Sequence, residues 1–300
     1  MINFKFTIFI IFILFSSYGF SEEKTLILGI KAFTENFILA EMAKQLFEDK
    51  GFNVVNKTGL GSAVARKALE LKQIDLYYEY TGTAYSVFYK GKEFHIMRNK
   101  DKLYNWLKKM DKTKGIIWLK PLNINNTYTL MLKKEVSDKL KIVSISDLKS
   151  YMDKRKNPIN IAIDAEFYGR PDGFQALSNH YNFDKEKYLV RIMEAGLTYL
   201  SLVKGLVDVA MGYSTDGRIM HYNLINLVDN KQFFPAYNPA PVIRKEILLK
   251  YPEIEKILNK IADVITLEVI RELNYKADVL HKTIKNICRE FLITHKLIGY

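Results

Sequence analysis

The stretch Leu26-Ile27-Leu28-Gly29-Ile30 is a short apolar run of the kind that forms a strand buried on both faces. The helix expected after it begins at a cap residue, Thr34, and its apolar face carries Leu39, Ala43 and Leu46 at helical spacing. Parallel strands need a crossover connection, which is usually a helix. This stretch therefore predicts an α/β fold built on parallel strands.

The same unit recurs along the chain. In the first half we expect strands at 53–56, 74–77 and 116–119, and helices at 62–71, 82–88 and 102–110. After Pro121 we expect strands at 128–133, 159–163, 188–193 and 207–211, with helices capped by Ser146, following Pro171-Asp172-Gly173, and over 197–204. From Glu246 the pattern is helical, with breaks near Pro252 and Leu267, and these helices are expected to pack on the first lobe.

No long Pro/Gly/Ser linker separates the two halves, so the connections between them must be short. Two α/β lobes joined by short crossings tend to form a cleft. Ligands of such proteins bind in the cleft, near the carboxyl ends of parallel strands.

Four tyrosines lie at predicted strand ends or turns: Tyr80, Tyr128, Tyr213 and Tyr237. Any one of them alone is ordinary, because the chain has 19 Tyr and 18 Phe and a half-buried packing tyrosine is common. Together, rings that project from one edge of a scaffold can form a box whose π faces attract a cation. The combination predicts a receptor for a quaternary ammonium compound, which cannot donate hydrogen bonds.

The N-terminus has the pattern of a secretory signal peptide over residues 1–21. Lys5 precedes an apolar run at 6–15, and Gly19 and Ser21 supply small residues for cleavage after Ser21. An uncleaved anchor is the alternative. The only cysteine, Cys288, lies far from the leader, so neither a lipid anchor nor an internal disulfide is expected. The mature chain is expected to be exported to the periplasm.

The net charge is +12, yet lysines alternate with acidic residues instead of gathering into a stripe. We therefore expect a solvated surface and no nucleic-acid partner.

The motifs of enzymes and cofactor sites match poorly. Gly59-Leu60-Gly61-Ser62-Ala63-Val64 has Val64 where the dinucleotide fingerprint requires its third glycine. The segment Gly212-Tyr213-Ser214-Thr215-Asp216-Gly217 has one residue too many for a nucleophile elbow, and the histidines lack metal-ligand spacing. We expect no cofactor, no metal and no catalysis. A secreted esterase that uses Ser214 is kept as the alternative from another class.

Around the four tyrosines the sequence resembles the substrate-binding proteins of glycine betaine/choline/proline ABC importers, the ProX and OpuC/OpuB group of the OpuAC-like family. The resemblance covers the mature chain and is carried by Lys31-Ala32-Phe33-Thr34-Glu35, Tyr78-Glu79-Tyr80-Thr81-Gly82-Thr83, Asn125-Asn126-Thr127-Tyr128, Arg170-Pro171-Asp172-Gly173, Gly212-Tyr213-Ser214-Thr215-Asp216-Gly217-Arg218 and Phe233-Phe234-Pro235-Ala236-Tyr237. It implies a type II periplasmic-binding-protein fold in which each lobe is a mixed, mostly parallel sheet flanked by helices. Lobe 1 would comprise residues 22–124 and 233–300, and lobe 2 residues 125–232, with the ligand cleft between them.

The resemblance also implies roles for particular residues. Tyr80, Tyr128, Tyr213 and Tyr237 would form the aromatic box, while Lys31, Thr83 and Arg170 would hold a ligand carboxylate. Glu166 matches a position linked to lobe closure, and Asn126 would line the pocket. Thr83 in place of an acidic residue favours a carboxylated ligand, whereas Asn36 stands where many relatives have glutamine.

The expected function is delivery of glycine betaine, or a related osmolyte, to a permease driven by a separate ATPase, with the binding protein acting as a monomer. A choline receptor, or a broad receptor for quaternary amines and proline, is the alternative within the class. A sensor that docks on a receptor would use the same closed form.

Overall fold

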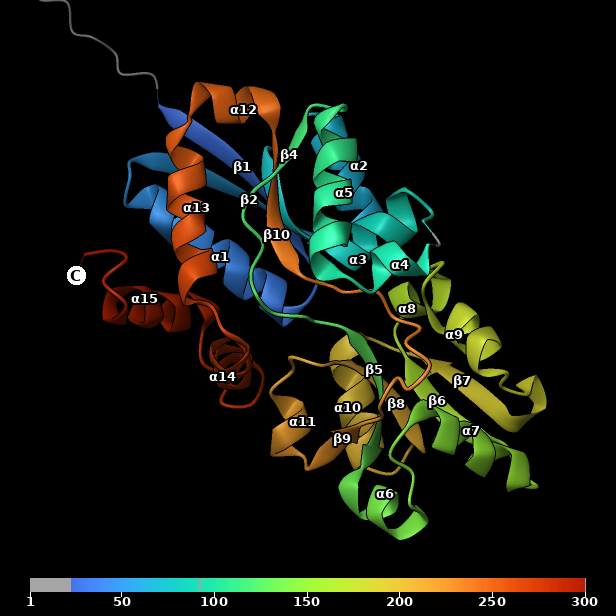
Figure 1. Cartoon of the computed structure of the whole chain (residues 1–300). Coiled ribbons are helices and arrows are strands. Elements are labelled where there is room, and N and C mark those ends of the chain that lie inside the picture. Colours follow the sequence, from blue (N-terminus) through green and yellow to red (C-terminus); the bar gives the residue numbers. More distant parts are fainter. Residues whose placement is uncertain (1–22, 92, 300) are drawn as a thin grey trace, which may run out of the picture.

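The computed structural model of the chain describes residues 23–91 and 93–299, and the predicted leader at 1–21 lies outside the described residues. Two five-stranded sheets form the centres of two lobes that lie end to end (Figure 1). The predicted α/β architecture with a mixed, mostly parallel sheet in each lobe is confirmed. Within the described ranges no helix is both long enough and apolar enough to cross a bilayer.

The first sheet has the order β2-β1-β3-β10-β4. Its strands are β1 (Lys24–Lys31), β2 (Phe52–Leu60), β3 (Leu76–Tyr80), β4 (Ile116–Trp118) and β10 (Pro239–Arg244). β1 pairs in parallel with β2 and β3, whereas β10 is antiparallel to both β3 and β4. The chain thus returns from the second lobe to insert β10 between strands of the first.

Helices cover both faces of this sheet (Figure 1). One core cluster joins β1–β3 to the apolar sides of four helices: α1 (Thr34–Glu48), α13 (Glu253–Val264), α14 (Leu267–Asp278) and α15 (Ile284–Thr294). The short α12 (Lys245–Lys250) precedes α13 in the chain. The opposite face packs on α2 (Ser62–Glu70), η1 (Ala84–Phe88) and α5 (Lys100–Lys112), with α3 (Thr81–Thr83) and α4 (Phe94–Met97) between them. The C-terminal helices α13, α14 and α15 thus pack on the first sheet.

The second sheet repeats this arrangement in the order β7-β6-β8-β5-β9. Its strands are β5 (Tyr128–Lys133), β6 (Ile159–Ile163), β7 (Tyr188–Ile192), β8 (Val209–Tyr213) and β9 (Leu224–Asn226), and here β5 is the antiparallel strand. Its helices are α6 (Lys134–Leu140), α7 (Ile145–Lys154), α8 (Ala165–Gly169), α9 (Phe174–Tyr181), η2 (Lys185–Lys187), α10 (Ala195–Val203) and α11 (Arg218–His221).

Two predicted caps are wrong. The residue before α1 is Phe33, whose backbone is extended and which makes no side-chain cap, so Thr34 is already helical. The Thr34 hydroxyl instead donates to Asp278 Oδ1 at 2.7 Å. The helix assigned to a Ser146 cap begins earlier, because Ser144 and Asp147 form a capping box in which each side chain satisfies the backbone N–H of the other.

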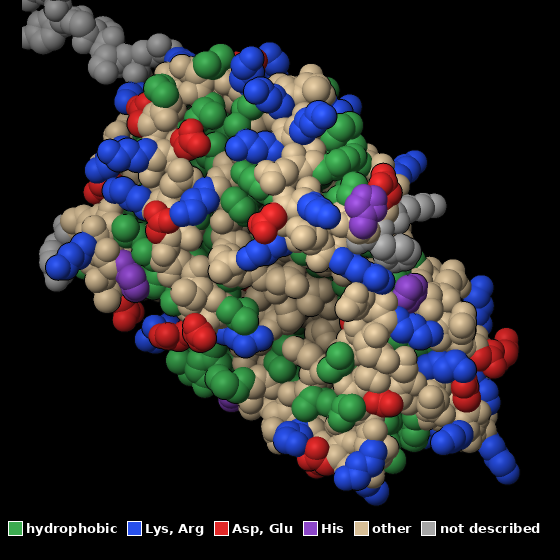
Figure 2. All heavy atoms as spheres, viewed as in Figure 1, with side chains coloured by type: hydrophobic (Ala, Val, Ile, Leu, Met, Phe, Trp, Pro, Cys, Tyr) green, Lys and Arg blue, Asp and Glu red, His purple; other side chains and the backbone are tan. Residues whose placement is uncertain are grey.

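Basic side chains are spread over both lobes on the visible face, with acidic side chains among them (Figure 2). This distribution agrees with the alternation of charge in the sequence. It gives the visible face no single basic stripe.

Candidate functional site

The topology brings the four tyrosine segments to one place. Tyr80 is the last residue of β3 and Tyr213 the last of β8. Tyr128 opens β5, which runs antiparallel to β8, so Tyr128 and Tyr213 are direct cross-strand partners. Tyr237 precedes β10, whose Pro239 is the partner of Tyr80. The antiparallel strand of each sheet therefore starts beside the carboxyl end of its parallel neighbour.

The four rings join one aromatic cluster. The Tyr128 ring lies 5.3 Å from the Tyr213 ring and 5.8 Å from the Tyr237 ring, measured between centroids. Phe33 links Tyr80 to the others, because its ring lies 5.6 Å from Tyr80 and stacks on Tyr213 at 5.5 Å. Phe33 lies in one of the motifs that carry the resemblance but was not among the predicted site residues.

Three of the tyrosine hydroxyls donate to buried carboxyl groups. Tyr80 donates to Glu35 Oε1 at 2.7 Å, Tyr213 to Asp164 Oδ2 at 3.0 Å, and Tyr237 to Asp172 Oδ2 at 2.6 Å. These bonds fix the orientation of each ring. Burial raises the pKa of all three hydroxyls above the ordinary value, so the rings remain neutral.

The carboxyl groups that accept these bonds were not predicted as site residues. Burial also raises the pKa of Glu35 and Asp164, and this effect exceeds the opposite effect of their hydrogen bonds. Glu35 and Asp172 do lie inside the motifs that carry the resemblance. Their positions in those motifs were the only sequence signal for them.

Arg170 is held by the chain's own groups. Its Nε and Nη2 lie 2.8 Å and 2.7 Å from the two carboxylate oxygens of Asp172. Its Nη1 donates to Thr83 Oγ1 at 3.2 Å and to Glu166 Oε1 at 3.3 Å. The guanidinium carbon also lies 5.2 Å from the Tyr128 ring centroid and 5.9 Å from that of Tyr237. The faces of two box rings thus already contact a cation.

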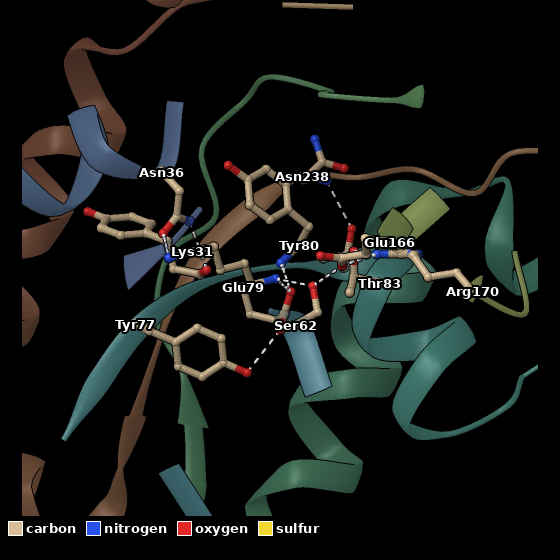
Figure 3. Close-up of polar contacts among 12 residues, drawn as sticks. Lys31, Asn36, Ser62, Tyr77, Glu79, Tyr80, Thr83, Glu166, Arg170 and Asn238 are labelled. Carbon is tan, nitrogen blue, oxygen red and sulfur yellow. Dashed lines mark hydrogen bonds and ion pairs between the residues drawn. The ribbon is translucent and has the colours of Figure 1, made fainter. Parts of the chain in front are cut away.

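Lys31 lies one step away from Arg170. Its Nζ is 2.5 Å from Glu79 Oε1 and 3.1 Å from Ser62 Oγ, and the lysine is 2% exposed (Figure 3). Ser62 in turn donates to Glu166 Oε1 at 2.6 Å. Lys31, Ser62, Glu166 and Arg170 therefore form a continuous polar chain from β1 to α8, although Lys31 and Arg170 share no direct contact.

Glu166 is the junction of this chain. Burial alone would raise the pKa of its carboxyl, but the Lys31 charge and the hydrogen bonds from Ser62 and Arg170 outweigh burial and lower the pKa below its ordinary value. Glu166 is thus ionised at neutral pH. Ser62 and Glu79, which complete this network, were not predicted.

Asn126 lies at the other side of the cluster. Its Nδ2 donates to Glu35 Oε1 at 3.0 Å, and its backbone N–H donates to the Tyr237 carbonyl at 3.1 Å. A pocket of about 160 Å³ adjoins it and is also lined by Phe33, Glu35 and Tyr213. The structure therefore brings all nine predicted site residues into one connected region, with Lys31 at its outer end.

Acidic groups outnumber basic ones in this region. The carboxyl groups of Glu35, Glu79, Asp164, Glu166 and Asp172 are joined by hydrogen bonds to the predicted residues, against two cations, Lys31 and Arg170. Such a balance suits a ligand with a positive end. Within residues 23–91 and 93–299, no cluster of three or more His, Cys, Asp or Glu side chains is arranged to hold a metal ion.

Ser214 does not have the surroundings of a nucleophile. Its Oγ donates to the Asn125 carbonyl at 3.1 Å and accepts from the Thr127 backbone N–H at 3.1 Å. The ring of His221 packs on Tyr222 and Tyr275. Ser214 therefore extends the pairing between β5 and β8.

Two α/β lobes with a buried aromatic and polar cluster at their strand ends define the class of two-lobed solute-binding proteins. The chain belongs to the OpuAC family, the substrate binding domain of ABC-type glycine betaine transport systems, whose model matches residues 24–294.

Relatives of known type agree with this assignment. The chain is 36% identical over 287 residues to a glycine-betaine-binding protein of Pseudomonas aeruginosa, covering 93% of this chain and 91% of that protein. It is 33% identical over 279 residues to the carnitine transport binding protein OpuCC of Listeria monocytogenes, covering 91% of this chain and 88% of that protein. The crystal structure of a glycine betaine/carnitine/choline ABC transporter matches with a TM-score of 0.73 and 28% identity, covering 91% of this chain and 100% of that chain.

The resemblance found in the sequence and the type II binding-protein fold are thereby confirmed. The chain is an extracytoplasmic substrate-binding protein that delivers a small ligand to an ABC permease, and it is not an enzyme. The esterase alternative based on Ser214 is dropped.

Proposed function

We propose that the chain binds glycine betaine, or a related quaternary ammonium osmolyte, with the cationic head among Tyr80, Tyr128, Tyr213 and Tyr237. The observation that carries this proposal is the convergence of the four rings, with Phe33, into one buried cluster. A trimethylammonium group cannot donate hydrogen bonds and loses little on leaving water, so ring faces discriminate in its favour over ammonium. Each ring contributes about 0.5–2 kcal/mol when desolvated.

The ligand carboxylate binds at Arg170 Nη1 and Thr83 Oγ1. These two atoms lie 3.2 Å apart, and Nη1 is the guanidinium nitrogen that Asp172 leaves unoccupied. A carboxylate arriving there displaces Glu166 from Nη1, and Glu166 keeps its bond to Ser62. Lys31, whose Nζ lies 3.1 Å from Ser62 Oγ, attracts the ligand carboxylate by its charge without contacting it. The carboxylate end therefore depends on a rearrangement of Glu166.

Closure of two lobes delivers the ligand. The proposed division is 22–124 with 233–300 against 125–232, which the membership of β10 in the first sheet and of β5–β9 in the second supports. The bonds from Ser62 to Glu166 and from Arg170 to Thr83 cross this division. A ligand that contacts both lobes favours the closed form by its differential affinity. We further propose a cleaved leader at 1–21, a periplasmic location, action as a monomer and a separate ATPase that drives the permease.

Calorimetric titration of the leaderless protein with glycine betaine, proline betaine, choline, carnitine and proline tests the ligand class. We expect heat of binding with the quaternary ligands, and Tyr213→Ala should weaken binding by about 3- to 30-fold because one ring is lost. Tyr168→Ala is the matched control, since that ring is 40% exposed on the same lobe. No binding of any quaternary ligand, or equal effects of the two variants, would contradict the proposal.

A choline receptor is the second candidate, and one observation favours it. Asp172 already occupies two of the three nitrogens of Arg170. A ligand with a net positive charge needs no rearrangement at Arg170. The ratio of the dissociation constants for glycine betaine and choline decides between the two candidates.

A further inference from the structure

Glu35 is a buried acid next to the rings that accepts hydrogen bonds from three side chains. It lies in the first turn of α1 and is 3% exposed. Its Oε1 accepts from the Tyr80 hydroxyl at 2.7 Å and from Asn126 Nδ2 at 3.0 Å, and its Oε2 accepts from the Thr215 hydroxyl at 2.6 Å. A single carboxyl group thus satisfies three donors.

These three donors come from both sides of the cleft. Tyr80 ends β3 in the first sheet. Asn126 precedes β5 and Thr215 follows β8, and both strands belong to the second sheet. If the lobes separate, the bond to Thr215 breaks, while the bond to Tyr80 can persist within the first lobe; Asn126 lies at the crossing between the lobes, where its backbone N–H donates to the Tyr237 carbonyl.

We infer that Glu35 is a positioning residue of the ligand site, which orients the Tyr80 ring and at the same time fastens the two lobes together. The inference rests on the proposed function, because it assigns the Tyr80 ring to the ligand. Glu35 acts through Tyr80 and needs no contact with the ligand. Ring geometry and lobe closure then depend on the same carboxyl group.

The geometry allows Glu35 to carry a proton in the closed form. Oε2 has one partner, the Thr215 hydroxyl, which can turn and accept a hydrogen bond in place of donating one. A proton on Oε2 therefore preserves all three contacts, since Tyr80 and Asn126 still donate to Oε1. Glutamine reproduces this arrangement, with its amide nitrogen facing Thr215.

The surroundings of Glu35 also favour the neutral acid. Burial raises the pKa of Glu35, and the Asp216 charge acts in the same direction. The adjoining pocket holds more acidic than basic groups, namely Glu194, Asp216 and Asp278 against Arg218, together with the Tyr213 ring. The Tyr80 hydroxyl is neutral, because burial raises the pKa of Tyr80 as well. The hydrogen bonds from Thr215, Tyr80 and Asn126 act in the opposite direction, but burial outweighs them and the net shift of the Glu35 pKa is upward.

The direction of the pH effect follows. When the lobes open, water reaches Glu35 and the pKa returns toward its ordinary value of 4.5. Closure then takes up a proton, and ligand affinity is highest below that ordinary pKa. As pH rises toward the pKa of the closed form, affinity falls by at most about tenfold per pH unit, and above that pKa it levels off.

The experiment measures the dissociation constant of glycine betaine and of choline at several pH values for wild type, Glu35→Gln and Glu35→Ala. Wild type should bind more weakly as pH rises, whereas Glu35→Gln should keep the low-pH affinity at every pH. Glu35→Ala should bind at least about tenfold more weakly, since three buried groups lose their partner. Glu48→Gln, on the exposed part of the same helix, should keep the wild-type pH profile. A Glu35→Gln profile parallel to that of wild type would overturn the inference.

A second arm separates this inference from the proposed function. If wild type binds none of the quaternary ligands, the proposed function fails, but the unfolding of wild type and Glu35→Gln can still be compared across pH. The folded-state pKa of Glu35 is raised, so the wild-type contribution is present below the ordinary pKa and is lost as pH rises. Stability curves with identical pH dependence would overturn the inference here too. If a Glu35 variant fails to fold, Thr215→Val takes its place, because it removes one of the bonds to Glu35. A Thr215→Val protein that binds the ligand as tightly as wild type would also overturn the inference.

Discussion

The Asp172 carboxylate holds the Arg170 guanidinium in a two-point ion pair, with Oδ1 2.8 Å from Nε and Oδ2 2.7 Å from Nη2. The same Oδ2 accepts the Tyr237 hydroxyl at 2.6 Å. The chain therefore supplies its own carboxylate to the arginine proposed for a ligand carboxylate. It also couples the charge of that arginine to the orientation of a box ring.

Asp172→Asn should destabilise the protein and make it depend on a carboxylated ligand. Asp172 and Arg170 are both nine-tenths buried, and removing one partner of a buried pair costs about 3 kcal/mol or more. The carboxylate of glycine betaine can restore part of this loss, whereas choline has none to offer. Thermal unfolding should show a larger betaine-induced shift for Asp172→Asn than for wild type, and no such gain with choline.

The control for this variant is Asp153→Asn, which removes an exposed ion pair with Lys149 on α7. It should leave both ligand shifts unchanged. Equal gains with betaine and choline would mean that Asp172 does not compete with a ligand carboxylate for Arg170.

Thr83→Val should separate carboxylated from uncarboxylated ligands. The Thr83 hydroxyl accepts from Arg170 Nη1 at 3.2 Å, and valine keeps the shape of the side chain without the oxygen. Betaine should lose about tenfold in affinity, which corresponds to one hydrogen bond to a charged group, while choline keeps its affinity. Calorimetry with both ligands measures the two changes, and Thr113→Val at the exposed end of α5 is the control. A similar loss for both ligands would place Thr83 at the cationic end.

Stability of the first lobe should depend on the buried pair of Arg66 and Asp111. Arg66 donates to both Asp111 oxygens at 2.8 Å and 2.6 Å, and Asp111 also accepts from Tyr89 and from Trp118 Nε1. Burial alone would raise the pKa of Asp111, but these bonds and the Arg66 charge lower it below the ordinary value of 3.8. Because the folded-state pKa is lowered, the contribution to stability is present above pH 3.8 and is lost as pH falls through the folded-state pKa.

Asp111→Asn should accordingly lower the free energy of unfolding by about 3 kcal/mol at pH 7, since Arg66 loses its buried counter-ion and keeps the partly exposed Glu70, 2.8 Å from its Nε. The difference from wild type should shrink as the pH is lowered below 3.8. Urea unfolding at neutral and acid pH measures both values. Asp101→Asn, in the exposed first turn of the same helix, should cost less than about 1 kcal/mol. A difference that persists in acid would show that packing, and not charge, explains the loss.

Local patterns predicted most of the fold, and the missed strands show where they fail. The strand at 159–163 is observed with those bounds, because a buried apolar run carries its own signal. β10 was missed because it contains Pro239 and Pro241, which argue against a central strand. The structure accommodates them because their carbonyls accept from Leu122 and Leu119. The positions without an N–H group therefore face β4, which has only three residues. The hydrogen bonds between β10 and β3 need no N–H from either proline.

The site was predicted only in part, for a related reason. The four tyrosines share a position in the chain, at strand ends, and this position could be read from periodicity. Glu35, Glu79 and Asp164 act through hydrogen bonds to side chains 45, 48 and 49 residues away, and no local pattern indicates such pairs. The pairing of Lys31 with Glu79 likewise depends on β1 lying beside β3. Residue type and spacing thus located the rings but not the carboxyl groups that orient them.

Gly82→Ala should disrupt the box without altering any residue that contacts the ligand. A Cβ at Gly82 would lie 2.6 Å from Tyr237 Cδ1 and 2.8 Å from the Pro235 side chain, closer than real Cβ contacts allow. The Tyr237 ring must then move, which breaks its bond to Asp172 and opens its contact with Tyr128. Calorimetry should show at least about a tenfold loss of affinity for both betaine and choline, because the proposed role of the ring is to contact the cationic head that they share. Gly61→Ala is the matched control, since its Cβ would meet nothing within 4 Å and its backbone has φ −72°. If Gly82→Ala bound both ligands like wild type, Tyr237 would have no part in holding the cation.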